Sequence, residues 1–144
     1  MTVKIKALTR YREKGGPGES LQQAEFITGI GMKGNFHQGG DKQLCLLTAE
    51  IREWMHSQKQ KGLCFARFKE NVLIEGVPGG ILLPGTRLYI EGVVLQVSES
   101  RKRCHAECRH YKQGMRCRLS ESAVFAAVER GGLIGVGDLV CVLV

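Results

Sequence analysis

The chain has 144 residues, of which 43% are hydrophobic, 21 are Lys or Arg and 14 are Asp or Glu, giving a formal net charge of +7. This length suits a single domain, residues 1–144, whose core needs no metal or disulfide. Because charges interrupt the apolar N-terminal residues, we expect neither a signal peptide nor a transmembrane segment there, and we expect a cytoplasmic protein. Because cytoplasmic thiols stay reduced, the six cysteines indicate metal binding, catalysis or burial rather than disulfides.

The first half of the chain predicts short strands around a glycine-rich segment. Residues 3–9 alternate apolar and polar side chains, the pattern of a half-buried strand, and residues 24–30 form a second extended piece. Residues 31–40 contain four glycines, which permit positive backbone φ values and the close approach of a ligand. An apolar run follows and ends at Thr48, where we expect a capped amphipathic helix that continues to about Lys61.

The second half predicts further strands. Residues 86–98 give two strands joined by a Glu-Gly turn, a β hairpin, and residues 139–144 give a last apolar strand. Residues 120–130 fit either a short helix capped by Ser120 or Ser122 or a strand, and periodicity alone does not decide between them. We therefore expect a mostly β (α+β) fold, a barrel-like antiparallel sheet with one or two short helices.

The segment of residues 101–118 holds most of the excess positive charge and half of the cysteines. It carries seven Lys or Arg against one acid and contains Cys104, Cys108 and Cys117. Nearby cations favour the thiolate, the form of sulfur that attacks or binds a metal. From the residues alone, Cys104, Cys108 and Cys117 are all candidates for a reactive or metal-binding thiol. The cations expected to neutralise a bound phosphate or molybdate are Arg101, Lys102 and Arg103.

Other interpretations of this segment stay open. A structural zinc site would use the three cysteines and either His105 or His110, although their spacing is wider than is usual for tetrahedral zinc. A further alternative is that the three thiols of the segment are ordinary buried side chains. We expect burial in the core for the other three cysteines, which lie in or beside apolar runs: Cys45, Cys64 and Cys141. The charge also suits an anion- or nucleic-acid-binding module, but a single tyrosine is the only aromatic residue in the segment, which disfavours base stacking.

A set of motifs follows in order along the chain: G-M-K-G-N-F-H-Q-G-G, F-K-E-N-V-L-I-E-G-V, L-P-G-T-R-L-Y-I-E-G-V-V-L-Q-V, K-R-C-H-A-E-C and V-F-A-A-V-E-R-G-G-L-I-G-V-G-D. Together they resemble the MOSC domain, a family named for the C-terminal domain of molybdenum-cofactor sulfurases. The resemblance spans about residues 8–140 and is greatest for the small stand-alone bacterial members. Its specific parts are the F-K-E-N-x-x-x-E-G stretch and the C-H-x-x-C stretch together with the V-F-A-x-V-x-x-G-G-x-I-x-V-G-D tail.

The resemblance implies a MOSC-type fold that holds a molybdenum cofactor (molybdopterin) or carries sulfur as a persulfide. In the family, a cysteine near the start of the last third of the domain is taken to bind molybdenum or bear the sulfur. The matching residue is Cys104, with Cys108 close to it. The pyridoxal phosphate of the larger sulfurases belongs to a separate desulfurase domain and is not expected here. The implied partners are a sulfur donor and a protein of molybdenum-cofactor biosynthesis or a molybdoenzyme.

The resemblance also implies residues that line the cofactor pocket. His37 lies where the family usually has G-D-x-H, but Asn35 stands in place of the acid, and a histidine in a surface turn is the alternative. Lys42 and Gln43 match a family stretch that normally contains Arg-Gln. Asn71 is expected to hydrogen-bond a pterin edge, unless it only forms a turn before a strand. If the acid that the family usually has at position 35 orients the histidine, the chemistry at His37 of this chain differs from that of the family.

These observations predict a domain that acts in cofactor sulfuration or in metal-sulfur delivery, and they do not decide whether it turns over a substrate. Larger MOSC proteins that reduce N-hydroxylated substrates carry an additional N-terminal β-barrel domain, so we do not expect self-sufficient reduction by this chain. The alternative function is a structural-zinc or anion-binding module built on residues 101–118. Nucleic acid is not an expected partner.

Overall fold

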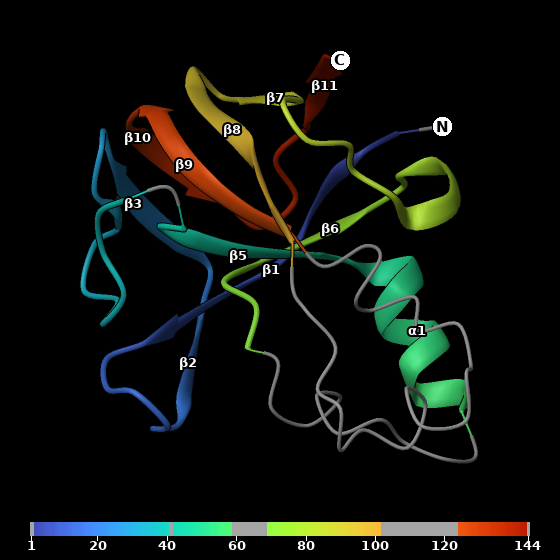
Figure 1. The fold of residues 1–144 in the computed structure, drawn as a ribbon, viewed down its shortest axis with the longest axis horizontal. Coiled ribbons are helices and arrows are strands. Elements are labelled where there is room, and N and C mark those ends of the chain that lie inside the picture. Colours follow the sequence, from blue (N-terminus) through green and yellow to red (C-terminus); the bar gives the residue numbers. More distant parts are fainter. Residues whose placement is uncertain (1, 41, 59–68, 102–123, 144) are drawn as a thin grey trace.

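The computed structural model describes residues 2–40, 42–58, 69–101 and 124–143 (Figure 1). As predicted, this part of the chain is mostly β, with one α-helix, α1 (Ala49–Ser57), and one 3-10 turn, η1 (Pro78–Gly80). The strands are β1 (Lys4–Tyr11), β2 (Gly18–Leu21), β3 (Gln23–Ile27), β4 (Gly31–Met32), β5 (Leu44–Thr48), β6 (Val72–Glu75), β7 (Arg87–Ile90), β8 (Val93–Arg101), β9 (Val124–Arg130), β10 (Gly132–Gly135) and β11 (Cys141–Leu143).

The described strands form two sheets. The larger has the strand order β11-β7-β8-β9-β5-β6-β1-β2, and the smaller has the order β10-β3-β4. β5 and β6 run parallel, with Leu46 opposite Val72, whereas the other described ladders are antiparallel. Because two parallel strands require a crossover connection, the chain leaves β5 directly into α1 before it returns in β6 (Figure 1).

The predicted barrel-like antiparallel sheet is only partly right. The sheets are not closed into a barrel, since β11 and β2 are the two ends of the larger sheet in the described part of the chain. A single bridge between Lys4 and Leu139, with a 2.9 Å hydrogen bond from the Ile5 amide to the Asp138 carbonyl, ties the C-terminal segment to β1. Alternation of side chains predicts strands, but it does not specify which strands pair or in which direction.

One buried hydrophobic cluster joins the two sheets. Along most strands alternate residues point into it, and in β1 an irregularity between Ile5 and Ala7 allows both Ile5 and Leu8 to do so. The smaller sheet contributes Phe26, Met32 and Ile134, and the larger sheet contributes Ile5, Leu8, Leu44, Leu46, Val72, Ile74, Leu88, Leu95, Ala126 and Val128 among others. Polar side chains that enter this region must therefore find partners inside the protein.

Helix α1 begins after Thr48, as predicted, but Thr48 does not cap it. The Thr48 hydroxyl instead donates a 2.7 Å hydrogen bond to the carbonyl of Gly80, which ties β5 to η1. α1 ends at Ser57, and the predicted continuation to Lys61 lies partly outside the described residues. In the described part of the chain, no helix has the length and apolar character needed to cross a membrane.

The two other sequence expectations have clear outcomes. For residues 120–130 the sequence left a helix and a strand as alternatives. The described part, residues 124–130, is a strand, because β9 lies between β8 and β5 in the larger sheet. Ser120 and Ser122 lie outside the described residues. The predicted hairpin is confirmed, with Glu91 and Gly92 at φ values of 48° and 83° in the turn between β7 and β8.

Gly76, directly after β6, should tolerate no side chain. Its φ is +92°, and a Cβ atom there would lie 2.1 Å from the backbone oxygen of Thr2. Gly85 has a similar φ of +83° with nothing within 4 Å of such an atom. We expect Gly76→Ala to lower the free energy of unfolding in urea by about 3 kcal/mol, from backbone strain plus the clash. Gly85→Ala, with strain alone, should cost about 1 kcal/mol. Equal losses would contradict the close approach of residue 2.

Candidate functional site

Asn71 lies just before β6, where β1, β5 and β6 meet, and it is only 3% exposed. Its Nδ2 group donates 3.1 Å hydrogen bonds to the Thr9 carbonyl and to Oδ1 of Asn35, and its Oδ1 accepts a 3.1 Å bond from the Cys45 amide. The Asn71 backbone also bonds Cys45 and Thr9. Both hydrogens of the side-chain amide are therefore used inside the protein, and they tie three strands together.

Asn35, in the glycine-rich segment, continues this network. Its Oδ1 accepts hydrogen bonds from Asn71 and from the Tyr11 amide at 3.0 Å, and its Nδ2 donates to the His37 carbonyl at 3.3 Å. The Phe36 amide donates to the Tyr11 carbonyl at 2.7 Å. Since a carboxylate has no hydrogen to donate, an acid at position 35 could not make the bond to His37. The amide thus fixes the glycine-rich segment against the end of β1.

Cys45 lies on the face of β5 opposite the core. Its neighbours in β5, Leu44 and Leu46, are fully buried, whereas Cys45 is half-buried and pairs with Phe125 across the ladder to β9. We call the surface formed by Cys45, Phe125 and Tyr11 the thiol face. Two ammonium groups lie over its aromatic rings: Lys42 Nζ is 5.1 Å from the Phe125 ring centroid and Lys69 Nζ is 5.9 Å from the Tyr11 ring centroid.

An ion pair adjoins the thiol face. The guanidinium of Arg52, on α1, contacts both carboxylate oxygens of Glu70, and both side chains are mostly buried. Burial raises the pKa of Tyr11 above its ordinary value, the charge of Glu70 raises it further, Arg52 opposes this, and Cys45 adds a smaller rise. The phenol, the thiol and the ion pair therefore form one electrostatically connected group.

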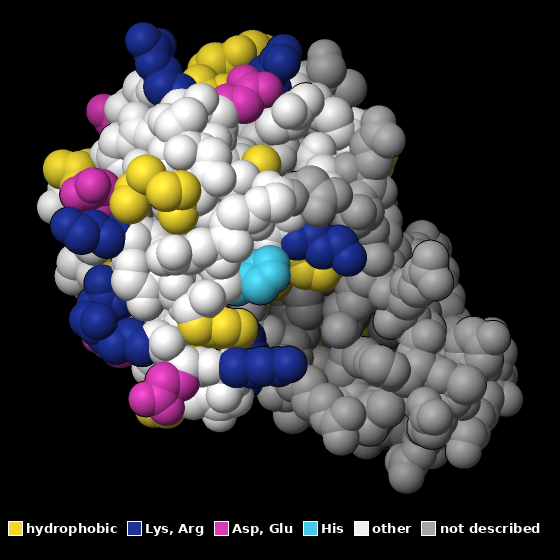
Figure 2. All heavy atoms as spheres, turned by 60° about the vertical axis from the view of Figure 1, so that its left-hand side comes forward, with side chains coloured by type: hydrophobic (Ala, Val, Ile, Leu, Met, Phe, Trp, Pro, Cys, Tyr) yellow, Lys and Arg dark blue, Asp and Glu magenta, His cyan; other side chains and the backbone are white. Residues whose placement is uncertain are grey.

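The structure places the predicted pocket residues in different settings. His37 and Lys42 are exposed, and on the face drawn in Figure 2 basic side chains lie on both sides of a histidine. Gln43 is buried: its Nε2 donates to the Gly40 carbonyl at 2.7 Å and its Oε1 accepts from the Val128 amide at 2.9 Å. Contacts of His37, Lys42, Gln43 and Asn71 with a cofactor stay predictions. A pterin that contacted the side chain of Gln43 or Asn71 would have to displace hydrogen bonds that this side chain already makes.

The basic, cysteine-rich segment is described only at its first residue. Arg101 ends β8 opposite Val124 of β9, and Val124 pairs in turn with Leu46 of β5. Arg101 and Val124, the residues that flank positions 102–123, are thus partners in a strand ladder. In the neighbouring ladder, the pair of Val124 with Leu46 is adjacent to the pair of Phe125 with Cys45. The predicted site residues Arg103, Cys104 and Cys108 lie outside the described residues, as do the proposed zinc ligands Cys117, His105 and His110.

Sequence reasoning missed several members of the thiol face. Cys45 was expected in the core because its neighbours are apolar, yet a thiol one position out of phase with buried leucines belongs to the other side of the strand. Cys141 was also expected in the core and is exposed, whereas Cys64 lies outside the described residues. Tyr11 and Arg52 gave no motif, and only the folded arrangement brings them to Cys45.

Comparisons with known proteins give a family and a fold. A model of the MOSC domain matches residues 33–141. The crystal structure of the YuaD protein from Bacillus subtilis is similar with a TM-score of 0.72 and 19% identity, over 99% of this chain and 96% of that one. YiiM from Geobacillus stearothermophilus gives a TM-score of 0.63 at 16% identity, over 99% and 75%, and YiiM from Escherichia coli gives 0.58 at 16%, over 98% and 70%. These identities support a common fold alone. No curated protein matched the chain.

Replacing Asn71 tests the network. Asn71→Leu would leave the Cys45 amide, the Thr9 carbonyl and Oδ1 of Asn35 short of a partner, so the free energy of unfolding in urea should fall by about 3 kcal/mol. Because Asn35→Ala removes a bond of the same network, the double variant should lose less than the sum of the two single losses. Gln38→Leu, at an exposed position nearby, is the control and should change stability little. Additive losses at 35 and 71 would contradict a shared network.

The phenol of Tyr11 should respond to its neighbouring carboxylate. We expect Glu70→Gln to lower the pKa of Tyr11 from its raised value toward the ordinary 10.0, because it removes a negative charge and leaves Arg52 unopposed. Ring ¹³C chemical shifts followed through a pH titration measure this directly, with Glu53→Gln, which removes an exposed acid on α1 next to Arg52, as the control. Since folding raises this pKa, the phenol's contribution to stability is present below pH 10.0 and is lost as the pH rises through the folded-state value.

Proposed function

Because the chain belongs to the MOSC domain family, we propose that it binds a molybdenum cofactor, carries sulfur as a cysteine persulfide, or combines the two in cofactor sulfuration or metal-sulfur delivery. The family match over residues 33–141, a range that includes Cys104 and Cys108, carries this proposal. The proposed setting is cytoplasmic, and the proposed partners are a sulfur donor and a molybdoenzyme or a protein of molybdenum-cofactor biosynthesis.

The geometry of the described residues supports the placement of this chemistry beside the thiol face. Arg101 and Val124, which flank positions 102–123, pair on neighbouring strands next to Cys45. The chain that carries Cys104 and Cys108 is therefore anchored at both ends on this part of the sheet. We therefore propose that Cys104 and Cys108 act near this face.

The described residues fit the anionic part of a molybdenum cofactor rather than its metal. Lys42 and Lys69 hold ammonium groups over the aromatic rings of the thiol face, and such cations attract an oxyanion. Among the described residues, no three His, Cys, Asp or Glu side chains are arranged to hold a metal ion. The proposed sulfur ligand to molybdenum is Cys104, and the residues proposed to contact the remainder of the cofactor are His37, Lys42, Gln43, Asn71, Arg101 and Arg103.

The proposed mechanism rests on an ionised thiol in a positive environment. Arg101 and Arg103 would favour the thiolate of Cys104, which can bind a soft metal or attack sulfane sulfur. In the sulfur-carrying step, this thiolate attacks the outer sulfur of a donor persulfide. A new S–S bond forms on Cys104, the donor's S–S bond breaks, and the donor leaves as a thiolate. A bound cofactor would supply the redox-active metal, while the cations of this chain would hold the anionic groups.

Metal, pterin and mass analysis test the proposal. Wild type, Cys104→Ser and Cys108→Ser should be purified from a host that makes the cofactor, with Cys141→Ser, which removes an exposed thiol elsewhere, as the matched control. We expect molybdenum with pterin, or an added mass of one sulfur atom, in wild type and Cys141→Ser, and loss of both in Cys104→Ser.

Three results would contradict the proposal. Cys104→Ser that keeps the molybdenum and the extra sulfur would exclude position 104 as their carrier. Stoichiometric zinc in wild type that is lost in both Cys104→Ser and Cys108→Ser would instead establish the structural-zinc alternative. Wild type without molybdenum, pterin, added sulfur or zinc would favour an anion-binding module on residues 101–118.

A further inference from the structure

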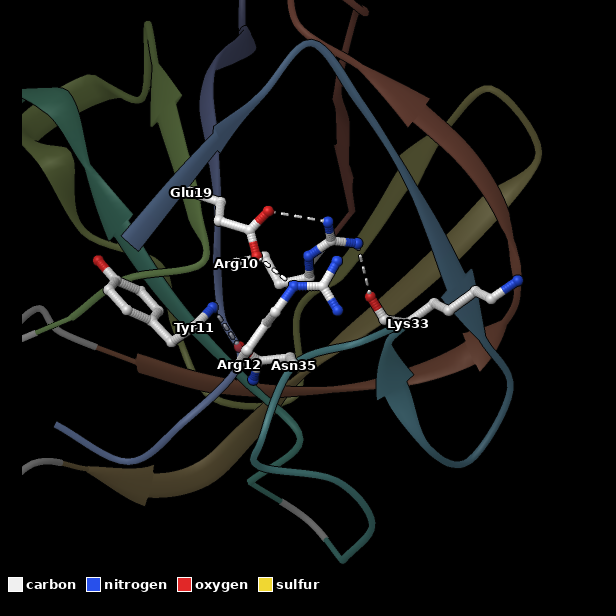
Figure 3. Close-up of polar contacts among 6 residues, drawn as sticks. All are labelled: Arg10, Tyr11, Arg12, Glu19, Lys33 and Asn35. Carbon is white, nitrogen blue, oxygen red and sulfur yellow. Dashed lines mark hydrogen bonds and ion pairs between the residues drawn. The ribbon is translucent and has the colours of Figure 1, made fainter. Parts of the chain in front are cut away.

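Arg10 of β1 and Arg12, which directly follows the strand, lie on the side away from the thiol face. Leu8 is buried in the core, and Arg10, two residues further along, has a side chain only 20% exposed, whereas that of Arg12 is 62% exposed. Figure 3 shows both guanidinium groups turned toward Glu19 of β2, while the ring of Tyr11 points the other way. The end of β1 and the residue after it therefore present a phenol to one side and two guanidinium groups to the other.

These two cations share one carboxylate. Glu19 accepts hydrogen bonds from Nη2 of Arg10 at 3.1 Å and from Nε of Arg12 at 2.5 Å (Figure 3). Lys33, which is close by, has its own partner in Glu25 at 4.0 Å. The group formed by Arg10, Arg12 and Glu19 thus retains one positive charge that no described carboxylate offsets.

Several donors of this group are unused. Nε of Arg10 is buried without a hydrogen-bond partner, and Nη1 of Arg10 reaches the Lys33 carbonyl only at 3.5 Å. Within the described residues, neither Nη group of Arg12 donates a hydrogen bond. Gly34 packs against Arg10 so closely that a Cβ atom there would lie 3.0 Å from Cδ and 3.2 Å from Nη1. The backbone of this segment therefore holds the Arg10 guanidinium in place before any ligand arrives.

We propose that Arg10 and Arg12 form a binding site for a phosphate group, with Glu19 as the internal carboxylate that the phosphate displaces. The planar fork of a guanidinium matches the oxygen spacing of phosphate and binds it in a bidentate manner. A partly exposed ion pair contributes little to stability, so Glu19 is readily released. Phosphate carries more charge and more acceptor oxygens than a carboxylate, and it can therefore use the donors that Glu19 leaves free.

The site is independent of the proposed molybdenum or sulfur function. The guanidinium groups of Arg10 and Arg12 point away from the ring of Tyr11 (Figure 3), and the proposed site uses described residues alone. The phosphate could be free or could belong to an organic molecule. Phe36 is 45% exposed, and its amide donates a hydrogen bond to the carbonyl of Tyr11, the residue between the two arginines. If this ring stacks on the base of a bound nucleotide, the nucleotide should bind more tightly than inorganic phosphate.

Titration of the purified protein with inorganic phosphate, and separately with adenosine monophosphate, tests the site. The readouts are the Nε–H NMR signals of arginine and the heat of binding, at constant ionic strength. We expect Arg12→Gln to weaken phosphate binding about tenfold, because it removes charge-assisted hydrogen bonds. Glu19→Gln should strengthen it, because no carboxylate then competes. Lys6→Gln, an equal loss of charge at an exposed position of β1, should leave binding unchanged.

The outcomes separate the explanations. Opposite effects of Arg12→Gln and Glu19→Gln with an unchanged Lys6→Gln establish the site, and a gain for the nucleotide that Phe36→Ala abolishes identifies an organic phosphate. Equal weakening by Arg12→Gln and Lys6→Gln would overturn the proposal in favour of general attraction to a basic protein. Absence of binding to wild type and to Glu19→Gln would also overturn it. None of these results depends on molybdenum or persulfide content.

Discussion

The side-chain amide of Asn71 holds together the junction on which the rest of the structure depends. It supplies a hydrogen-bond acceptor to the Cys45 amide and donors to the Thr9 carbonyl and to Asn35, at the point where a parallel strand pair meets an antiparallel one. Buried backbone groups left without partners cost several times the net gain of a single bond. The same network fixes the amide of Tyr11 through Asn35, so the thiol face and the glycine-rich segment both take their positions from this one side chain.

β1 connects two chemically different surfaces because its side chains alternate. Tyr11 joins Cys45 and the Arg52–Glu70 pair on one side, where burial and charge raise the pKa of the phenol. Arg10, and Arg12 just after the strand, turn to the other side and share one carboxylate. A family-based function beside the thiol face and a phosphate site behind it are thus compatible within one small domain, and each can be tested without the other.

Local patterns predicted local structure well. Alternating residues gave β1, and the Glu-Gly turn gave the hairpin of β7 and β8, because each signal lies within a few residues. The parallel pairing of β5 with β6 has no such signal. Asn71 was expected from the family resemblance to face a cofactor, but its bond to Asn35 spans 36 residues of sequence and could not be read from either position. The substitution of Asn35 for the family's acid becomes intelligible only in the structure, where the amide donates to the His37 carbonyl.

Hydrogen exchange of the Cys45 backbone amide tests the central claim most directly. This amide donates to the side chain of Asn71 rather than to a strand, so its protection reports on the junction itself. If Asn71 holds the three strands together, the Cys45 amide should exchange only through global unfolding, as slowly as the best-protected amides of β5 and β9. Exchange as fast as that of the exposed residue Gln38 would show that the junction opens locally, and would contradict the account given for the thiol face.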